Sequence, residues 1–281
     1  PFLPHPPLLL YYSNMGCWIE QKILSLFSPS LLQPFCIPCC RSTVAMEEIR
    51  YVAGLPYADE ILTFLLNKFR VQEPITLSLD ATADDVHSFF TDLRNGGVDN
   101  SIVAVTKSEN SLEDEIVGIC LNHVDPKPEG HQSVIEFDPF KDYKEEVDSG
   151  PYKERNANRL NAFIGALEGD VHSTLGRVDR IFHVDVICVD KAYSRQGIAS
   201  ELLRRSLQHA RDLDCDRIST VATAVASQHL FRKAGFYTIR ELPFSCFREN
   251  RIPIFRNLPD GGRSGLLMAF TLKGDDDDDM R

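Results

Sequence analysis

The pattern that most constrains the fold is a strand, a short loop and a long amphipathic helix in direct succession. Residues 180–189 place Phe182, Val184, Val186 and Cys188 on one face of a predicted strand. Residues 197–214 repeat apolar side chains at spacings of three and four, which is typical of an amphipathic helix. The loop between them contains a single glycine, Gly197. Strands that alternate with helices in this way favour a mixed α/β sheet.

The rest of the chain from Met46 onward shows the same alternation of strand and helix patterns. Strand patterns occur at residues 48–52, 101–107, 116–124, 217–224, 237–243 and 265–272, and helix patterns at 57–70, 83–94, 155–168 and 227–234. The Asn-Gly-Gly sequence at 95–97 predicts a helix stop, and the charged stretch 126–152 predicts an excursion over the surface. We expect one domain over residues 46–273, with about seven strands and four or five helices.

Neither end of the chain shows this alternation of strand and helix patterns. Residues 1–45 hold seven of the 16 prolines, and proline at that density interrupts helix and strand. No basic region precedes a long apolar stretch there, as a secretory signal would require. We expect a disordered or non-native leader with Met46 as the natural start, or alternatively a disordered arm with one marginal helix near residues 18–26. Residues 274–281 include five aspartates and predict an acidic, solvated tail.

Composition excludes several classes of protein. Of 281 residues, 43% are hydrophobic and 25% charged, which is ordinary globular usage, and no apolar stretch is long enough to span a membrane. A formal charge of −11 argues against a nucleic-acid partner and suits cationic ligands such as amines. Single, widely spaced cysteines predict a reducing compartment, and so a cytoplasmic protein. Cys36, Cys39 and Cys40 lack a second ligand pair, so we expect no metal.

The loop before the helix at 197–214 has the features of a phosphate-binding turn. Free amides at a helix N-terminus, together with the helix dipole, attract anions. Gly197 has no Cβ and lets a phosphate approach the backbone. Arg195 and Arg204 add positive charge, and Ser200 adds a hydroxyl donor. The sequence therefore predicts a diphosphate site, with a plain strand-turn-helix bend as the alternative.

Two segments carry a resemblance to a known family. Residues 193–199, Tyr-Ser-Arg-Gln-Gly-Ile-Ala, resemble the acetyl-CoA loop of the GNAT superfamily of N-acetyltransferases, written Q/R-x-x-G-x-G/A, although Ser194 stands where the family prefers Gln or Arg. Residues 227–236 resemble its second signature, a short helix that ends in Gly-Phe. The resemblance covers residues 46 to about 272. Residues 71–76 are similar to the Asp-Glu-Pro-Leu phrase of the invertebrate arylalkylamine (dopamine-type) N-acetyltransferases.

The resemblance implies a strongly twisted sheet whose two central strands separate, with acetyl-CoA between Val189 and Ser219. It implies no metal. The backbone of the first strand would hold the thioester carbonyl and the pantetheine, and the loop would hold the pyrophosphate. The cofactor-binding residues expected on this basis are Ile187, Cys188, Val189, Arg195, Gln196, Gly197, Ile198, Ala199 and Ser200.

The implied reaction is transfer of the acetyl group to a primary amine, first of all an arylalkylamine or biogenic amine, by direct attack in a ternary complex. A protonated amine cannot attack, so a base is needed. Glu73 is the candidate by its match to the family's Glu-Pro, and Pro74 biases it toward an extended backbone. The alternative is that Glu73 is an exposed loop residue beside a helix end.

Four further side chains are candidates for the catalytic site. His183 and Asp185 share a strand face and would relay a proton or form a structural pair. Thr223 and Ser227 match the two hydroxyls of the arylalkylamine branch, although Ser227 also suits a helix N-cap. Phe231 occupies the place of the tyrosine that many superfamily members use as an acid. Cys188 is expected on the face opposite His183, which argues against an acyl-enzyme.

The acceptor and the assembly are less constrained by the sequence. We expect a small-molecule amine partner and a monomer or weak dimer. The alternatives are a polyamine or a protein amino group as acceptor, or a module that binds CoA without catalysis, since Ser194 and Phe231 depart from the family pattern. The stretches 126–152 and 244–263 are the expected walls of the acceptor site. An arylalkylamine needs an apolar slot for its ring, and several phenylalanines could supply one, although aromatic side chains at helical spacing belong more often to a core than to a pocket: Phe69, Phe89, Phe90, Phe163, Phe244 and Phe247.

Overall fold

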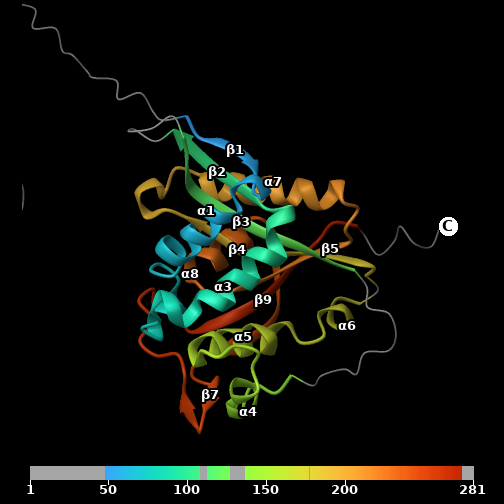
Figure 1. Ribbon diagram of the computed structural model, residues 1–281. Coiled ribbons are helices and arrows are strands. Elements are labelled where there is room, and N and C mark those ends of the chain that lie inside the picture. The colour runs from blue at the N-terminus through green and yellow to red at the C-terminus, as the bar shows by residue number, and fades with distance from the viewer. Residues whose placement is uncertain (1–47, 108–112, 127–136, 177, 274–281) are drawn as a thin grey trace, which may run out of the picture. The chain divides into compact units, whose positions relative to one another are not determined.

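A seven-stranded sheet forms the centre of the domain (Figure 1). The computed structural model describes residues 48–107, 113–126, 137–176 and 178–273. The strand order is β1-β2-β3-β4-β5-β9-β6, with β4 and β5 parallel and every other pair antiparallel. The strands are β1 (Arg50–Ala53), β2 (Ile102–Lys107), β3 (Asp114–Pro126), β4 (Arg180–Val189), β5 (Arg217–Ala222), β6 (Tyr237–Pro243) and β9 (Ser264–Thr271), and a separate hairpin pairs β7 (Arg248–Glu249) with β8 (Ile252–Pro253).

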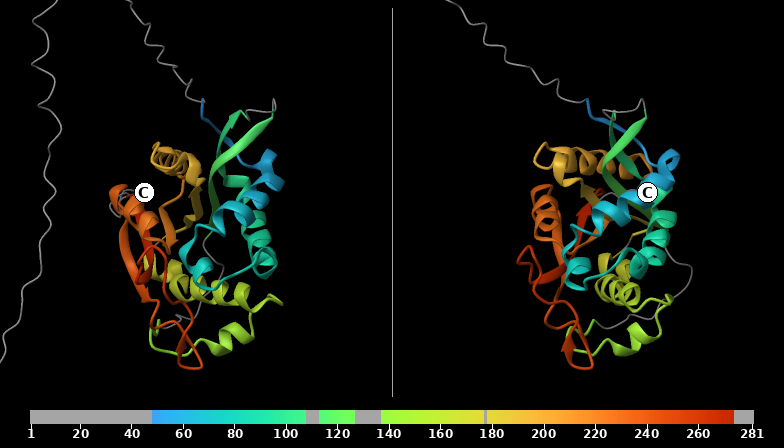
Figure 2. Two further views of the ribbon diagram at one scale, coloured as in Figure 1. Left: turned by 90° about the vertical axis from the view of Figure 1, so that its left-hand side faces the viewer. Right: turned by 60° about the vertical axis from the view of Figure 1, so that its left-hand side comes forward.

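Helices pack on both faces of this sheet (Figure 2). One apolar core lies under α1 (Ala58–Phe64), α3 (Ala83–Gly97) and α5 (Arg155–Glu168), and the other under α7 (Ile198–Asp212) and α8 (Val225–Lys233). A π-helical turn, Leu65–Phe69, follows α1. Three helices of five residues each were not predicted: α2 (Pro74–Ser78), α4 (Lys144–Asp148) and α6 (Val171–Leu175). The mixed α/β class and the seven strands are as the sequence predicts.

The two parallel strands pair only at their beginnings. Ile181, Phe182 and His183 of β4 lie opposite Arg217, Ile218 and Ser219 of β5. The hydroxyl of Thr220 then donates to the carbonyl of Val184 at 2.8 Å, and no further residue pair joins the two strands. The remainder of β4 therefore leaves its edge toward β5 open.

A β-bulge in β4 corrects one prediction. Asn122 pairs with Val184 and Leu121 with Val186, so Asp185 is an extra residue on β4. Val184 accordingly packs in the core under α7 and α8, but Val186 and Cys188 pack under α1, α3 and α5. The expectation of one face for all these residues, with Cys188 opposite His183, is wrong, because the extra residue changes the alternation.

The helix stop predicted at residues 95–97 is confirmed, since α3 ends at Gly97, three residues beyond the predicted helix pattern. A Cβ on Gly97 would lie 3.2 Å from the Cβ of Leu121, so the glycine serves close packing of α3 on β3. The leader at 1–45, the tail at 274–281 and part of the stretch 126–152 lie outside the described residues. The domain boundary at Met46 stays a prediction. None of the described helices has the length and hydrophobicity that crossing a bilayer requires.

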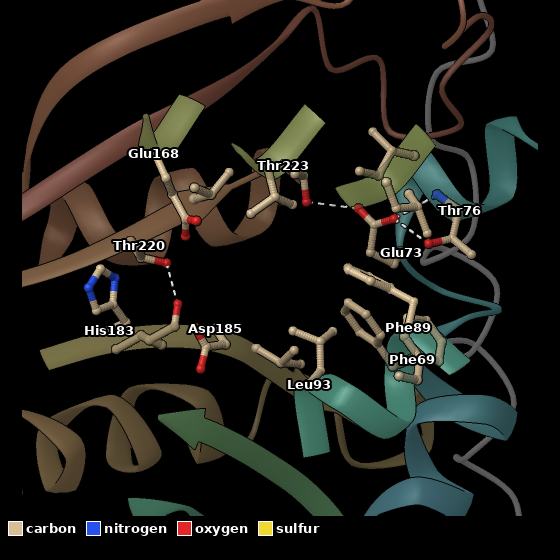
Figure 3. A pocket seen from close by; sticks show the side chains of 17 residues that line it. Phe69, Glu73, Thr76, Phe89, Leu93, Glu168, His183, Asp185, Thr220 and Thr223 are labelled. Carbon is tan, nitrogen blue, oxygen red and sulfur yellow. Dashed lines mark hydrogen bonds between the residues drawn. The ribbon is translucent and has the colours of Figure 1, made fainter. Parts of the chain in front are cut away.

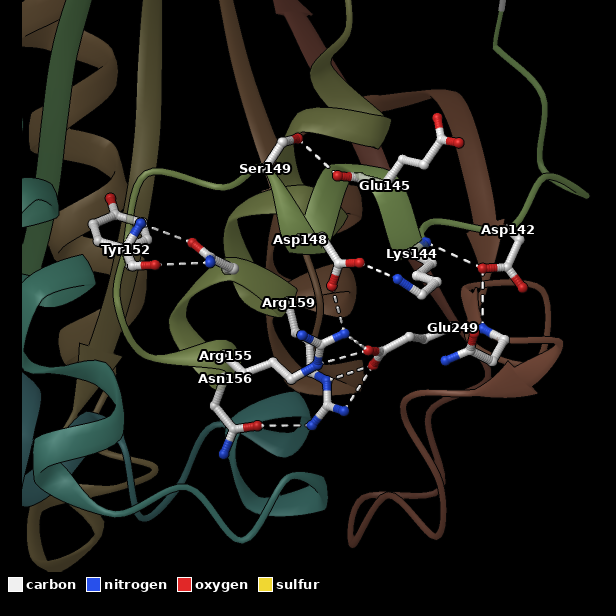
Figure 4. A network of polar contacts seen from close by, with 12 residues as sticks. Asp142, Lys144, Glu145, Asp148, Ser149, Tyr152, Arg155, Asn156, Arg159 and Glu249 are labelled. Atoms are coloured by element: carbon white, nitrogen blue, oxygen red, sulfur yellow. Dashed lines mark hydrogen bonds and ion pairs between the residues drawn. The ribbon is translucent and has the colours of Figure 1, made fainter.

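An ion-pair network fixes α4 and the β7–β8 hairpin to the first turns of α5 (Figure 4). Glu249 of the hairpin accepts hydrogen bonds from Arg155 Nε and Arg159 Nη2 of α5, both at 2.7 Å. Asp148 of α4 pairs with Arg155 at 2.8 Å. These contacts fix the N-terminal end of α5 and therefore help to position its C-terminal end, which lies close to β4 and β5.

Candidate functional site

A groove opens where β4 and β5 separate. It has a volume of about 500 Å³ and extends from Ala199, in the first turn of α7, to Glu73 before α2. Between these ends it is lined by the outer half of β4, the end of β5 and one side of α8: Asp185, Val186, Ile187, Cys188, Val189, Thr220, Val221, Thr223, Ala224, Ala226, Ser227, His229, Leu230, Phe231 and Lys233.

The loop at the α7 end of the groove presents free backbone amides. Gly197 is the N-cap of α7, with φ of +82°, and no side chain caps the helix. No acceptor in the described part of the chain takes the amide hydrogens of residues 195–200. Arg195 is exposed beside them, whereas Arg204 is held by both carboxylate oxygens of Glu201 at 2.7 Å. Free amides at this place are compatible with a diphosphate, and binding by Gln196, Gly197, Ile198, Ala199 and Ser200 stays a prediction.

Two amides of β4 point into the groove. Asp190 donates its amide to the carbonyl of Val117 on β3 at 2.8 Å. Because strand amides alternate between the two edges, those of Val189 and Ile187 point away from β3, toward the gap. The intervening Cys188 packs under α1, α3 and α5. Burial, and then the negative charges of Asp190 and Glu73, raise the pKa of its thiol to about 12. An un-ionised thiol is a poor nucleophile, so an acyl-enzyme stays disfavoured, for a different reason than predicted.

Glu73 lies at the other end of the groove and is only 6% exposed. It is the N-cap of α2, with an extended backbone before Pro74, as expected. Its Oε2 accepts hydrogen bonds from the amide and the hydroxyl of Thr76, both at 2.7 Å, and its Oε1 accepts one from the hydroxyl of Thr223 at 2.8 Å. Burial nevertheless raises the pKa of Glu73 above its ordinary value. The alternative of an exposed loop residue is therefore wrong.

A second cavity lies on the far side of Glu73 (Figure 3). Glu73 lines both spaces, and so do Phe69, Asp185, Val186, Thr220, Val221 and Thr223, so the cavity and the groove lie side by side along the gap between β4 and β5. Its sides are apolar and its far end is polar. The sides are Phe69, Ile75, Phe89, Phe90, Leu93, Leu160, Ile164, Val184, Val186 and Val221, and the far end is Glu168, His183, Asp185 and Thr220. Of the six phenylalanines named from the sequence, Phe69, Phe89 and Phe90 line the cavity, whereas Phe163, Phe244 and Phe247 lie in the apolar core away from it.

His183 and Asp185 both line this cavity, but each binds another residue. His183 Nδ1 lies 2.7 Å from the Ser219 hydroxyl, and Asp185 Oδ2 lies 2.8 Å from His123 Nδ1 on β3. The rings of His123 and His183 stack at 4.5 Å. Burial, with the charges of His123 and His172, lowers the pKa of His183 to about 3. Neutral His183 is thus a weak base, and the imidazole that pairs with Asp185 is His123, which the sequence analysis missed.

The two candidate hydroxyls have different positions. Thr223 contacts Glu73 directly. Ser227 lies in the first turn of α8 and donates to the carbonyl of Ala224 at 2.9 Å. Ala224, not Ser227, is the N-cap, because α8 begins at Val225. Ser227 lines the groove, and Phe231, one turn further along α8, is almost fully buried.

Glu168 is the functional candidate that the sequence analysis did not single out. It is the last residue of α5, where helical periodicity shows only a polar side chain near a helix end. Burial, and then the negative charge of Asp185, raise its pKa to about 7. A shift of that size in a cavity marks a candidate functional residue, but the sequence carries no local signal for it.

Comparisons with known proteins agree with this geometry. Residues 117–236 match the model of the Acetyltransferase (GNAT) family. The Uncharacterized N-acetyltransferase YafP of Escherichia coli (strain K12) is 26% identical over 102 residues, which are 36% of this chain and 61%, less than two thirds, of that protein.

Solved structures show the same fold. Arylalkylamine N-acetyltransferase 2 of Aedes aegypti is 18% identical, with a TM-score of 0.64 over 80% of this chain and 100% of that chain. The polyamine N-acetyltransferase of Drosophila melanogaster, described as forming N-acetylagmatine, is 19% identical, with a TM-score of 0.59 over the same shares of both chains. At these identities the likeness establishes the fold, and the acceptor has to be inferred from this chain's own residues.

Proposed function

We propose that this chain, an N-acetyltransferase of the GNAT superfamily, transfers the acetyl group of acetyl-CoA to a primary amine, and that the amine is an arylalkylamine. One observation carries the proposal. Glu73, a buried carboxylate with a raised pKa, lies where the groove from the free loop amides meets an apolar cavity. A base between a site for acetyl-CoA and a site for the amine is what direct transfer requires.

Acetyl-CoA is a substrate of this reaction, and each part of it has a matching part of the groove. The free amides of residues 196–200, with Arg195 beside them, would bind the pyrophosphate. The amides of Ile187 and Val189 would bind the pantetheine and the thioester carbonyl, and they also stabilise the oxyanion that develops on that carbonyl. The thioester then lies near Glu73 and Thr223.

Proton transfer follows from the environment of Glu73. The raised pKa makes its carboxylate a better acceptor for the ammonium proton than an exposed glutamate would be. The neutral nitrogen attacks the thioester carbon, the N–C bond forms and the C–S bond breaks. The nitrogen then loses its second proton and the departing thiolate takes up one, so that the Ser227 hydroxyl at the groove wall is the candidate relay, which receives a proton from the nitrogen side as it gives one to the sulfur. Thr223 holds the carboxyl of Glu73 in place.

The lining of the cavity supports an aromatic acceptor. The rings of Phe69 and Phe90 lie 5.6 Å apart, and those of Phe89 and Phe90 lie 5.9 Å apart. Such a cluster offers ring faces and edges to a further aromatic ring. The carboxyls of Glu168 and Asp185 at the far end favour a polyamine as the second candidate. A monomer or weak dimer in the cytoplasm remains our expectation for the protein.

The test is thiol release from acetyl-CoA with tyramine, dopamine or tryptamine, and with spermidine or a lysine peptide in parallel. Glu73→Gln should lower kcat by roughly 10²- to 10⁴-fold, with an unchanged Kd for acetyl-CoA, because only the base is lost. Glu145→Gln, at an exposed glutamate on α4, is the matched control. An unchanged kcat would remove Glu73 from the mechanism. Tight CoA binding with no release for any amine would favour a binding module.

A further inference from the structure

We propose that the far end of the acceptor cavity recognises a hydrogen-bond donor on the acceptor amine, and that Glu168 is the specificity-determining residue that receives this bond. The inference rests on the proposed use of this cavity by an amine, and it goes beyond that proposal in naming a second recognition point. The acceptor would therefore have two functional groups, a reacting amine at Glu73 and a donor group at Glu168.

The carboxyl of Glu168 is presented to the cavity by the end of α5. Gly169 follows with φ of +48° and turns the chain away from the helix. Figure 3 shows the carboxyl pointing into the cavity, across from His183 and Asp185. Arg240 is close, but its guanidinium binds the backbone carbonyls of Leu167 and Glu168, at 3.1 and 2.9 Å.

No donor reaches the side chain of Glu168 within the described part of the chain. The polar groups around it bind one another instead. Asp185 binds His123 at 2.8 Å, the Ser219 hydroxyl lies 2.7 Å from His183, and Asp125 lies 3.2 Å from His172. The side chain of Glu168 is only partly exposed, and a carboxyl that is largely shielded from water and receives no protein donor is unfavourable. Desolvation is the first cause that raises its pKa to about 7. A donor on a bound ligand would supply the missing bond.

Glu73 and Glu168 both line the cavity, so an acceptor that fills it meets a carboxyl group at two places. Thr223 holds Glu73, and Thr220 lies at the Glu168 end of the cavity. Apolar side chains such as those of Phe89 and Leu93 line the sides of the cavity. The cavity therefore suits an apolar stem with a polar group at each end. The ring hydroxyl of an arylethylamine and the second ammonium of an alkyl diamine share this donor chemistry.

Two pairs of amines test the proposal, each pair differing in the distal donor alone: tyramine against phenethylamine, and cadaverine against pentylamine. In at least one pair, kcat/KM should be about 10- to 100-fold higher for the amine that carries the donor, as expected for a hydrogen bond to a charged group. Glu168→Met has a similar length and no acceptor oxygen, so it should bring that ratio close to one. Glu145→Gln should leave the ratio unchanged.

Glu168→Gln separates the two sources of the donor. Its amide oxygen still accepts a hydrogen bond from a ring hydroxyl, so the tyramine ratio should survive. The glutamine side chain carries no charge, so the ratio of kcat/KM for cadaverine to that for pentylamine should fall in this variant. Either result supports the proposal. Equal kcat/KM within both pairs for the unaltered protein, or a ratio that persists in Glu168→Met, would overturn it.

Equilibrium binding of the same four amines to the CoA-bound protein keeps this inference apart from the proposed function. If no amine is acetylated but the donor-bearing amine binds more tightly, and Glu168→Met removes that difference, the transferase proposal fails and the recognition site stands. If no amine binds and none is acetylated, both proposals fail. Thermal unfolding of each variant establishes that the variant is folded, so that a change in the kcat/KM ratio cannot be attributed to unfolding.

Discussion

A carboxyl group lies at each end of α5, and the pKa values of the two groups are shifted in opposite directions. At the N-terminal end, Arg155 and Arg159 surround Glu249, which is 8% exposed (Figure 4). Burial alone would raise the pKa of Glu249, but its bonds to the two guanidinium groups outweigh burial and lower it. At the C-terminal end, Glu168 has no cationic partner among the described residues, and burial raises its pKa to about 7.

The comparison shows that the partners of a buried carboxylate decide its use. The carboxylate of Glu249 is paired with two arginines of α5, so it joins the β7–β8 hairpin to that helix and has a structural role. Glu168 is unsatisfied and lines a cavity. Glu73 lies between these two cases. Its carboxylate accepts hydrogen bonds from amide and hydroxyl donors, but no cationic side chain of the described residues pairs with it, and its pKa is raised. The absence of a cation keeps Glu73 able to take up a proton.

The largest effect is expected from Glu249→Gln, which tests whether the paired carboxylate stabilises the fold. We expect the free energy of unfolding at pH 7 to fall by about 2 kcal/mol, because two guanidinium groups lose their counter-charge while Arg155 keeps some solvent. The folded pKa of Glu249 is lowered, so its contribution is present above the ordinary value of 4.5 and is lost as the pH falls through the folded pKa. Urea unfolding at pH 7 and pH 3 should show the difference shrink. Equal stability of variant and parent at pH 7 would contradict a structural role.

Glu168→Gln should raise the free energy of unfolding, whereas Glu249→Gln lowers it. The folded pKa of about 7 lies above the ordinary value of 4.5, so the stability contributed by the protonated form is fully present below pH 4.5 and is lost as the pH rises through 7. The variant should therefore be more stable than the parent at pH 8, by about 1–2 kcal/mol, and equal to it at pH 4. Urea unfolding at these two pH values measures it. A variant that is less stable at pH 8 would show that the carboxylate has a partner.

A smaller effect is expected from Thr223→Val, which removes one donor from Glu73 and keeps the shape of the side chain. The pKa of Glu73 is already raised, and loss of a bond that favours the carboxylate raises it further. The base must be ionised, so kcat/KM falls as the pH drops through that pKa. The acidic limb of the pH profile should move up by roughly half a pH unit to one unit. Thr63→Val, at a hydroxyl that binds only its own helix, should leave the limb in place.

Local pattern was sufficient for the elements that build the cofactor side of the site. The predicted bounds of β4, α5 and β6 agree with the structure, and those of α7 agree to within two residues. Loop amides were also predictable, because a glycine before a helix defines them locally. The partner of Glu73 was harder to foresee. Thr223 is separated from it by 150 residues, and each was a candidate only through resemblance to a family.

By itself, the sequence determined the strands of the central sheet and the longer helices, and that a glycine turn opens α7, because hydrophobic periodicity and turn chemistry act over a few neighbouring residues. Tertiary structure alone decided the rest. The bulge at Asp185 turned Cys188 to the other core, His123 replaced His183 as the partner of Asp185, and the end of α5 placed Glu168 in the cavity. The physical reason is that burial, strand register and the presence or absence of a counter-charge depend on residues far apart in the chain.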